Sequence, residues 1–471
     1  MKQSIIYISR ILPLVVAIAA CNKVKDFGST NVDPNSTTTP LVNALLTNVE
    51  SGISGYATST SGGLFCQYFS ETQYPGTGLY ASSSLTASFT GNYSGSLMDL
   101  QNIIATNSSN NQNAVARILK AYIYWKISDQ WGDLPYSEAL KGNGTPKYDT
   151  QEEIYKGCIK ELTEAIAQFD NGISLITGDF IYSGKVAYWK KLANSIRLLM
   201  AMRLTKKYPN ASDYAATEFK AALAGNGGII TDVSENFTAS YGGDKYKSPW
   251  YSLYDGRKDI GESQTMTDLL ASFGDGRQDA YGSSTQGVPY GWTRTNIENW
   301  ANSNGDWSRV LAANYRTTAG SVIIISAAEV FLARAEAADR GWTTENAQNM
   351  YTSGIKASFA QWGLGTPAAS YFTQSGVAFT ATPGTGANLK QIAIQRYIAS
   401  YPDGNEGWAE WRRTGYPALT PAIAATNTSK LIPRRYAYHS SEYTSNTANV
   451  NAAVARLTGG DTQDAKIWWD K

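Results

Sequence analysis

The sequence predicts an all-α fold in which antiparallel helix pairs form a scaffold and long irregular loops build a ligand-binding face. Two observations carry this prediction. Apolar residues recur at helical spacing in consecutive segments, and two long stretches rich in Gly, Ser, Thr and aromatic residues interrupt that rhythm. We therefore expect the helices to position the loops and the loops to carry the function.

The predicted helices follow one another in pairs. Each has apolar side chains three and four residues apart, which places them on one helix face. The second pair ends at Gly225, a residue type common after helix C-termini, and a short turn at Gly341 joins the third pair. The predicted helices cover residues 115–130 with 151–169, 185–204 with 214–224, and 323–340 with 344–362.

A small, aromatic, small pattern recurs within these pairs at spacings of four and three. Small residues let helices approach, and the ring fills the space between neighbouring pairs. The segment from Trp189 also resembles the opening of a tetratricopeptide helix, so we predict a tetratricopeptide-like scaffold. Generic antiparallel helices remain the alternative, because there is no strict period of about 34 residues. The pattern comprises Ala215, Phe219, Ala222, then Ala347, Tyr351, Gly354, with Ala165 and Phe169 as a partial copy.

The irregular stretches cover residues 55–92 and 229–316 and place aromatic rings beside amides. A sugar has an apolar C–H face that lies flat on a ring and hydroxyls that suit polar side chains. We therefore predict that loops near 65–80 and 285–310 hold a glycan. For each single ring, packing in the core is the alternative. The candidate ligand-binding residues are Tyr74, Tyr80, Tyr290, Trp292, Trp300 and Trp307.

The first twenty residues have the layout of a bacterial secretory signal. Lys2 and Arg10 are followed by an apolar run that ends in small residues before Cys21. The run is shorter than the roughly 20 apolar residues that span a bilayer. We predict that residues 1–20 are a lipoprotein signal peptide and that Cys21 is lipidated. An ordinary cut after Ala19, leaving a periplasmic protein, is the alternative.

The organisation after Cys21 follows from composition. Residues 21–40 are polar and rich in Ser, Thr, Asn and Pro, which predicts a flexible tether. Residues 41–471 then form a single helical domain whose only membrane contact is the lipid anchor. A net charge of +1 argues against a nucleic-acid partner. Cys66 and Cys158 could form one disulfide, but they lack partners for zinc binding or thiol catalysis. We expect no cofactor and no metal.

Support for catalysis is weak, and we predict that the protein is not an enzyme. A Ser-His-Asp triad would rest entirely on His439, the single histidine. With 39 acids, a chance carboxylate pair of the kind a glycosidase uses stays possible. Glu329 and Glu336 share one helix face, and a buried carboxylate needs a donor. We therefore predict a structural ion-pair network between these glutamates and Arg412 and Arg413.

Several motifs are spread along almost the whole chain. Trp131 to Ala139 reads W-G-D-x-P-Y-x-E-A, which resembles a loop of the SusD/RagB-like family, and Trp131, Asp133 and Pro135 would have structural roles there. The segment around Glu329 and Glu336 matches the family's E-x-x-x-L-x-A-E-A pattern. Another match is Trp408-Ala409-Glu410-Trp411-Arg412-Arg413-Thr414-Gly415-Tyr416-Pro417.

This resemblance, to the second SusD-like branch, implies a function. Members have a tetratricopeptide-like scaffold and form lids on SusC-like TonB-dependent transporters. They are lipid-anchored in the outer membrane, facing the exterior, and pass oligosaccharides, or peptides in some branches, to the transporter. The resemblance thus implies a transporter partner and an oligosaccharide ligand, with peptide binding as the alternative. Apart from the resemblance, glycoside hydrolysis by a carboxylate pair remains a less favoured alternative.

Overall fold

The long helices form close to where apolar spacing predicts them. The computed structural model of the protein describes residues 41–170, 173–379, 382 and 388–471. The predicted signal peptide, Cys21 and the tether of residues 21–40 lie outside the described residues. Backbone contacts group Val42–Lys471 into one compact unit.

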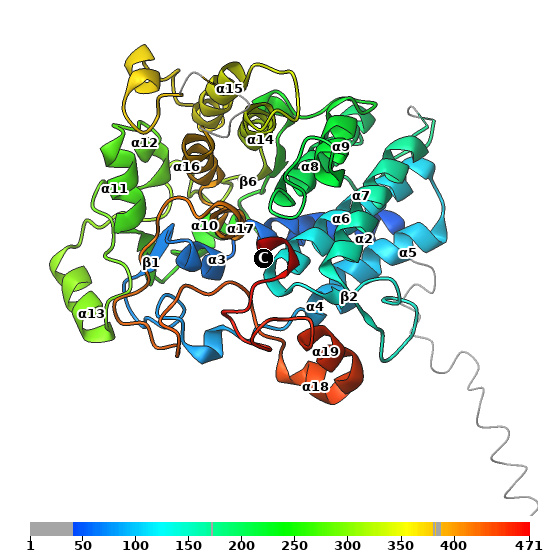
Figure 1. Ribbon diagram of the computed structural model, residues 1–471, viewed down its shortest axis with the longest axis horizontal. Coiled ribbons are helices and arrows are strands. Elements are labelled where there is room, and N and C mark those ends of the chain that lie inside the picture. The colour runs from blue at the N-terminus through cyan, green and yellow to red at the C-terminus, as the bar shows by residue number, and fades with distance from the viewer. Residues whose placement is uncertain (1–40, 171–172, 380–381, 383–387) are drawn as a thin grey trace, which may run out of the picture. The chain divides into compact units, whose positions relative to one another are not determined.

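Six long helices of the described chain pack in three sequential pairs, as predicted, and Figure 1 shows the pairs following one another across the unit. Their ends follow local chemistry: Ser109 accepts a hydrogen bond from the backbone N–H of Gln112, and Thr150 and Glu153 form a reciprocal capping box. The all-α prediction is confirmed. The pairs are α6 (Asn110–Trp131) with α7 (Gln151–Gln168), α8 (Val186–Arg203) with α9 (Tyr214–Leu223), and α14 (Ala327–Asp339) with α15 (Ala347–Ala360).

The predicted helix of residues 323–340 is wrong at its start. Val322–Ile325 forms strand β6, which pairs antiparallel with β4 (Phe237–Ala239). Four consecutive β-branched residues favour a strand. Ser326 then caps α14 through a reciprocal bond with Glu329. The apolar run therefore contributes to a strand and to the helix that follows it, and Ser326 marks the boundary between them.

The small, aromatic, small pattern lies at the contact between paired helices. Gly354 of α15 packs against Leu332 of α14, and a Cβ added at Gly354 would lie 2.6 Å from the Leu332 Cγ. Only glycine permits this approach. In α9 the equivalent residues Ala215, Phe219 and Ala222 are fully buried.

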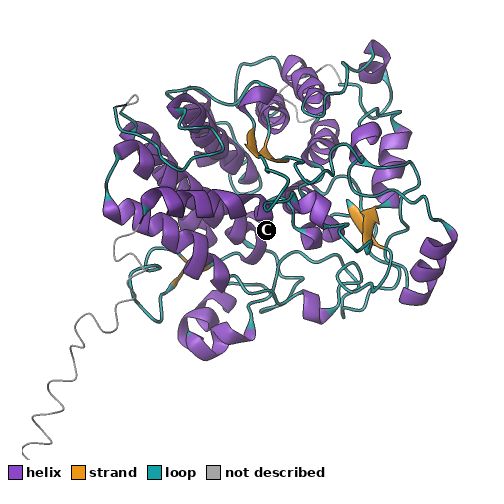
Figure 2. Cartoon of the chain, turned by 180° about the vertical axis from the view of Figure 1, so that it is seen from behind, coloured by secondary structure: helices purple, strands orange, loops and turns teal. Residues whose placement is uncertain are grey.

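The remaining elements are shorter and frame the two irregular stretches, which contain more helix than predicted. Figure 2 shows that the strands are brief additions to a helical structure. They form antiparallel two-stranded pairs. The helices are α2 (Val42–Ile53), α3 (Thr60–Phe65), α4 (Thr90–Asn92), α5 (Met98–Thr106), α10 (Pro249–Ser252), α11 (Gln264–Ser272), α12 (Gln278–Tyr281), α13 (Arg294–Ser303), α16 (Leu389–Ser400), α17 (Gly404–Thr414), α18 (Ser440–Ser445) and α19 (Thr447–Val454). The further strands are β1 (Phe69–Glu71), β2 (Leu134–Pro135), β3 (Tyr148–Asp149) and β5 (Ile260–Glu262).

The core is continuous from the helix pairs to the loop side. Trp125 of α6, Trp189 of α8 and Trp408 of α17 are fully buried. Helix α17 crosses α3 so closely that a Cβ at Gly404 would collide with the backbone of Gly63. This contact fixes the start of the first irregular stretch onto the scaffold, because α3 leads directly into β1.

In Figure 1 the helices α5 to α9 occupy one side of the unit, and β1, α11 and α13 occupy the other. The second side carries both predicted binding loops. In the part of the chain that the structure describes, no helix is both long and apolar enough to cross a membrane.

Candidate ligand-binding site

The strand pair β1–β5 brings the two irregular stretches together. Phe69 pairs with Glu262 and Glu71 with Ile260. Beyond the pair, Thr72 donates its backbone N–H to the Asp259 carbonyl at 2.8 Å and its hydroxyl to the Lys258 carbonyl at 2.6 Å. The loop after β1 and the loop before β5 therefore emerge side by side, although they are far apart in sequence.

Glu71 fixes the shape of the first loop. Its Oε2 accepts hydrogen bonds from the backbone N–H groups of Gly76 at 3.1 Å and Gly78 at 2.9 Å, and its Oε1 accepts one from Thr77 at 3.3 Å. Burial raises the pKa of this carboxyl above its ordinary value, and the three N–H donors oppose that shift. The turn closed in this way presents Tyr74, whose side chain is 59% exposed and whose φ of 52° is left-handed.

Helix α13 supplies the opposite wall. It begins at Thr293, whose hydroxyl accepts a hydrogen bond from the Asn296 N–H at 3.4 Å. One helix face packs Ile297 and Trp300 against Val288 and Trp307. Another face presents Arg294, Glu298, Ala301 and Asn302, at spacings of four, three and one, toward the Tyr74 loop.

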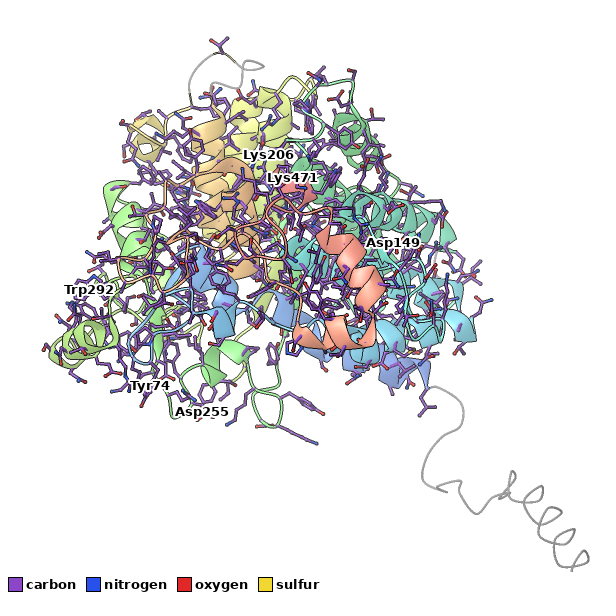
Figure 3. The ribbon with its side chains drawn as sticks, turned by 60° about the horizontal axis from the view of Figure 1, so that its bottom comes forward. Tyr74, Asp149, Lys206, Asp255, Trp292 and Lys471 are labelled. Carbon is purple, nitrogen blue, oxygen red and sulfur yellow. The ribbon has the colours of Figure 1, made fainter. Side chains whose placement is uncertain are left out.

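A cavity of about 330 Å³ lies between these walls. Side chains from the loop after β1, the loop before β5 and α13 all reach it. Figure 3 labels Tyr74 and Trp292 on the same side of the unit. The lining of the cavity is mainly polar and consists of Thr72, Gln73, Tyr74, Lys258, Arg294, Glu298, Ala301, Asn302, Gly305, Trp307 and Arg309.

Two of the six predicted ligand-binding aromatics, Tyr74 and Trp307, line this cavity. Trp307 is only 3% exposed, so it forms part of the floor and not a free platform. Trp292 and Trp300 are half-buried against the cluster of Val288, Ile297 and Trp307 and are not part of the lining. Their role in ligand binding stays a prediction, because neither ring lines this cavity.

The prediction for Tyr80 is wrong, because its ring is fully buried. Its hydroxyl accepts a hydrogen bond from the Ala422 N–H at 3.0 Å. Tyr290 is half-buried, outside the cavity, and donates its hydroxyl to the Leu64 carbonyl at 2.7 Å. Both rings hold loops together. Composition placed these rings in the binding stretches but could not distinguish packed rings from exposed ones.

Sequence reasoning missed the charged residues of the cavity, Lys258, Arg294, Glu298 and Arg309. The signal that could have found part of them is the polar face of the 294–303 segment, which has helical spacing. Arg294 and Glu298 are four residues apart and form an ion pair at 2.8 Å. Lys258 and Arg309 reach the cavity from loops whose packing no local pattern reveals.

Glu262 lies behind the cavity wall, fully buried at the end of β5. It accepts hydrogen bonds from the Ser308 hydroxyl at 2.7 Å and the Gln278 amide at 2.8 Å. Burial raises its pKa to about 8. Glu262 does not line the cavity, so we assign it to structure and not to ligand contact.

The scaffold holds a second, buried group of charges. Glu336 pairs with Arg413 at 2.6 Å and with Arg396 at 3.1 Å, and Glu410 pairs with the same two arginines at 2.7 and 2.9 Å. Burial alone would raise the pKa of Glu336, but Arg413 lowers it below its ordinary value. The predicted ion pair between Glu336 and Arg413 is therefore present in the structure.

The proposed network is wrong for Arg412 and Glu329. Arg412 pairs with neither glutamate: it donates to the backbone carbonyls of Asp129 and Arg434 at 2.7 and 2.8 Å. Glu329 accepts from the backbone and side chain of Ser326 as part of its helix cap, and burial raises its pKa to about 8. Adjacent residues on a helix point in different directions, and here Arg412 and Arg413 reach different partners.

The residues of the W-G-D-x-P-Y loop join distant segments. The Trp131 indole donates to the Ala87 carbonyl at 3.1 Å. One Asp133 oxygen accepts from the Gln151 N–H at 2.8 Å, which secures the start of α7, and the other pairs with Arg456. Pro135 lies in β2, which pairs with β3. All of these contacts are within the protein.

Groups suited to catalysis do not gather at the cavity. Glu298 is the single carboxylate in its described lining, whereas glycoside hydrolysis uses two. His439 caps α18 by accepting from the Ser441 N–H. Cys66 and Cys158 are free and buried, and burial raises the pKa of both thiols. Among described residues, no three His, Cys, Asp or Glu side chains gather as a metal site.

Comparison with known proteins gives consistent results. The model of the second SusD-like family, described as starch-binding and associating with the outer membrane, matches residues 31–439. No curated protein sequence matches the chain.

Solved structures with the same fold cover nearly all of the chain. A chitin-binding SusD homologue from Flavobacterium johnsoniae has a TM-score of 0.81 at 25% identity, covering 91% of this chain and 98% of its own. A SusD homologue from Bacteroides uniformis has a TM-score of 0.79 at 27% identity, covering 91% and 99%. A structure described as a chitin-binding protein has a TM-score of 0.78 at 27% identity, covering 91% and 100%.

Proposed function

The chain belongs to the second SusD-like family of outer-membrane-associated starch-binding proteins, and from this premise we propose that it captures oligosaccharides for nutrient uptake without cleaving them. The observation that supports this most directly is the cavity. Two loop regions far apart in sequence meet there and provide a ring, amides and charged groups at one place. The chitin-binding descriptions of two structural neighbours support a carbohydrate ligand over a peptide.

We further propose that the protein acts at the cell surface with a SusC-like TonB-dependent transporter. Lipidation at Cys21 would anchor it to the outer membrane with its body facing the exterior, and the tether would let it reach the transporter. Co-purification with a tagged transporter tests the partnership. Loss of membrane association in a Cys21→Ala variant, with unchanged folding, tests the anchor. Membrane retention of that variant without the transporter would contradict lipid anchoring.

The ligand proposal is tested by calorimetry against starch, chitin and other plant and algal oligosaccharides. We expect dissociation constants between about 1 μM and about 1 mM. Tyr74→Ala should weaken binding by roughly 3- to 10-fold, the range for one ring contact. Tyr246→Ala is the matched control, because Tyr246 is 66% exposed but lines a different groove. Weaker binding in the control alone would move the site to that groove.

The absence of cleavage is tested on the same glycans. Reducing ends should not accumulate during prolonged incubation. Their release, if abolished by Glu298→Gln, would instead make the cavity a hydrolytic site. Binding of peptides with no glycan binding would favour the peptide-binding alternative.

A further inference from the structure

The cavity between the Tyr74 loop and α13 carries an excess of positive charge. Three cations, Lys258, Arg294 and Arg309, line it with one carboxylate, Glu298. Glu298 is already paired with Arg294. The whole chain has a net charge of only +1, so this excess is a local property and not a reflection of overall composition.

Lys258 and Arg309 have no carboxylate partner among the described residues. The Arg309 guanidinium donates only to backbone carbonyls, to Trp307 at 2.9 Å and to Gly305 at 3.5 Å. The Lys258 side chain is exposed. By contrast, the neighbouring Arg257 pairs with Asp259. Two cations thus remain available to a ligand at the cavity, because the nearby carboxylate of Asp259 is paired with Arg257.

Cations also cover the rings that would otherwise stack on a neutral sugar. The Arg294 guanidinium carbon lies 4.6 Å from the centre of the Tyr74 ring, and that of Arg309 lies 4.2 Å from Trp307. Trp307 is 3% exposed, so it has no second face to offer. At this floor a ligand meets a guanidinium group, whose chemistry suits the paired oxygens of a carboxylate or a sulfate.

Groups that suit hydroxyls accompany these cations. Gln73 donates its amide N–H to Asp259, which leaves its carbonyl oxygen to accept. Asn302 lies exposed on the cavity face of α13. A small inorganic anion would leave these amides unused, whereas a sugar that carries an anionic group would use both sets.

We propose that this cavity binds acidic oligosaccharides, with Arg309 and Lys258 holding a carboxylate or sulfate and Gln73 and Asn302 contacting neighbouring hydroxyls. This inference rests on the proposed glycan-capture function and narrows its ligand class. Arg309 and Lys258 are specificity-determining residues in this scheme, and the chitin bound by structural neighbours, which is uncharged, is not the preferred ligand here.

The test is calorimetry of the purified protein with tetragalacturonate and with its methyl ester, which has the same rings and linkages without charge. We expect the acid to bind at least 10-fold more tightly at low salt. The preference should shrink as salt rises from roughly 50 to roughly 500 mM, because the Debye length falls. A sulfated tetrasaccharide that binds more tightly than tetragalacturonate would identify sulfate as the anion and support the proposal.

Variants locate the effect. Lys258→Gln and Arg309→Gln should each weaken binding of the acid by roughly 3- to 10-fold and leave the ester unchanged. Arg309 also holds its loop. The Lys258 side chain makes no hydrogen bond or ion pair with the described residues, so Lys258→Gln keeps the test independent of folding. Lys466→Gln is the control, because Lys466 is exposed and outside the cavity.

The possible failures are distinguishable. Equal affinity for acid and ester would overturn this inference and leave glycan capture intact. If tetraglutamate binds as tightly as tetragalacturonate, the cavity recognises charge alone, and the proposal that its ligand is a sugar is overturned. No binding of any glycan, charged or neutral, would overturn the proposed function itself.

Discussion

In the scaffold, Glu336, Glu410, Arg396 and Arg413 form mutual ion pairs with side chains at most 3% exposed. At the cavity, the same chemical groups face solvent: Arg294 is 61% exposed and Lys258 and Arg309 lack a carboxylate partner among described residues. Buried charges must satisfy one another because desolvation is costly, whereas exposed charges can be left for a ligand. Burial, and not residue type, separates the arginines of the scaffold network from the arginines that line the cavity.

The largest effect should come from breaking the scaffold network. Arg413→Ala leaves Glu336 and Glu410 each short of a buried partner, so we expect a loss of about 3–5 kcal/mol of unfolding free energy. Urea unfolding followed by circular dichroism measures it. Arg117→Ala is the control, since its pairs with Glu161 and Glu164 are partly exposed and should be worth less than about 1 kcal/mol. Equal losses would remove the distinction between the two regions.

Glu262 differs from the carboxylates of both regions. It is buried, but its hydrogen-bond partners are the neutral side chains of Ser308 and Gln278. Burial raises its pKa from 4.5 to about 8, so the folded state favours the protonated form. Its contribution to stability is present below about pH 4.5 and is lost as pH rises toward about 8. Glu262→Gln removes this loss and should be more stable than the parent at about pH 9 by on the order of 2 kcal/mol.

The Glu262 comparison is read from urea unfolding at several pH values. The parent and the variant should approach each other in acid and separate in base. Parallel curves would mean that the folded protein holds Glu262 ionised, and the carboxyl would then belong with the paired charges of the scaffold.

An intermediate effect is expected at Glu71, a half-buried carboxyl that shapes the exposed site. Glu71→Gln retains one acceptor for the three backbone N–H groups that fix the Tyr74 turn. We expect oligosaccharide affinity to fall roughly 5- to 10-fold, about 1 kcal/mol, with faster amide exchange at residues 76–78. Glu164→Gln, on the distant α7, should change neither. Unaltered exchange and affinity would show that the turn needs no carboxylate.

The smallest change in stability should come from Glu298→Gln. The Arg294–Glu298 pair is an exposed pair four residues apart, so its loss should cost less than about 0.5 kcal/mol. Affinity for tetragalacturonate should instead rise roughly 2- to 3-fold, because the cavity loses its carboxylate. Removal of Arg413 would thus lower the stability of the scaffold, whereas removal of the Glu298 charge would raise the affinity of the cavity for an acidic ligand. A drop in affinity would assign Glu298 to hydroxyl recognition.

Much of the fold could be predicted because helices depend on local order. The three helix pairs and the small, aromatic, small contacts follow from spacing along the chain, and the resemblance to the SusD-like family was confirmed. Errors arose where two elements share one apolar run, as at residues 322–325, since periodicity over four residues cannot separate a strand from a helix.

The binding side was predicted only as a region. Residues 65–80 and 285–310 do meet at the cavity, yet Tyr80 is buried and the charged lining was missed. The β1–β5 pair brings the loops together, and α13 turns Arg294 and Glu298 toward them. These are contacts between segments far apart in the chain.

By itself the sequence determined the helical class, the order of the paired helices and the family, because each depends on residues within a few turns of one another. Only the tertiary structure decided which arginines are buried and paired and which face a cavity. Arg412 and Arg413 are neighbours with different partners, and Trp300 and Trp307 are alike in sequence but differ in whether they line the cavity. Exposure is a property of the whole packed unit, so no local pattern encodes it.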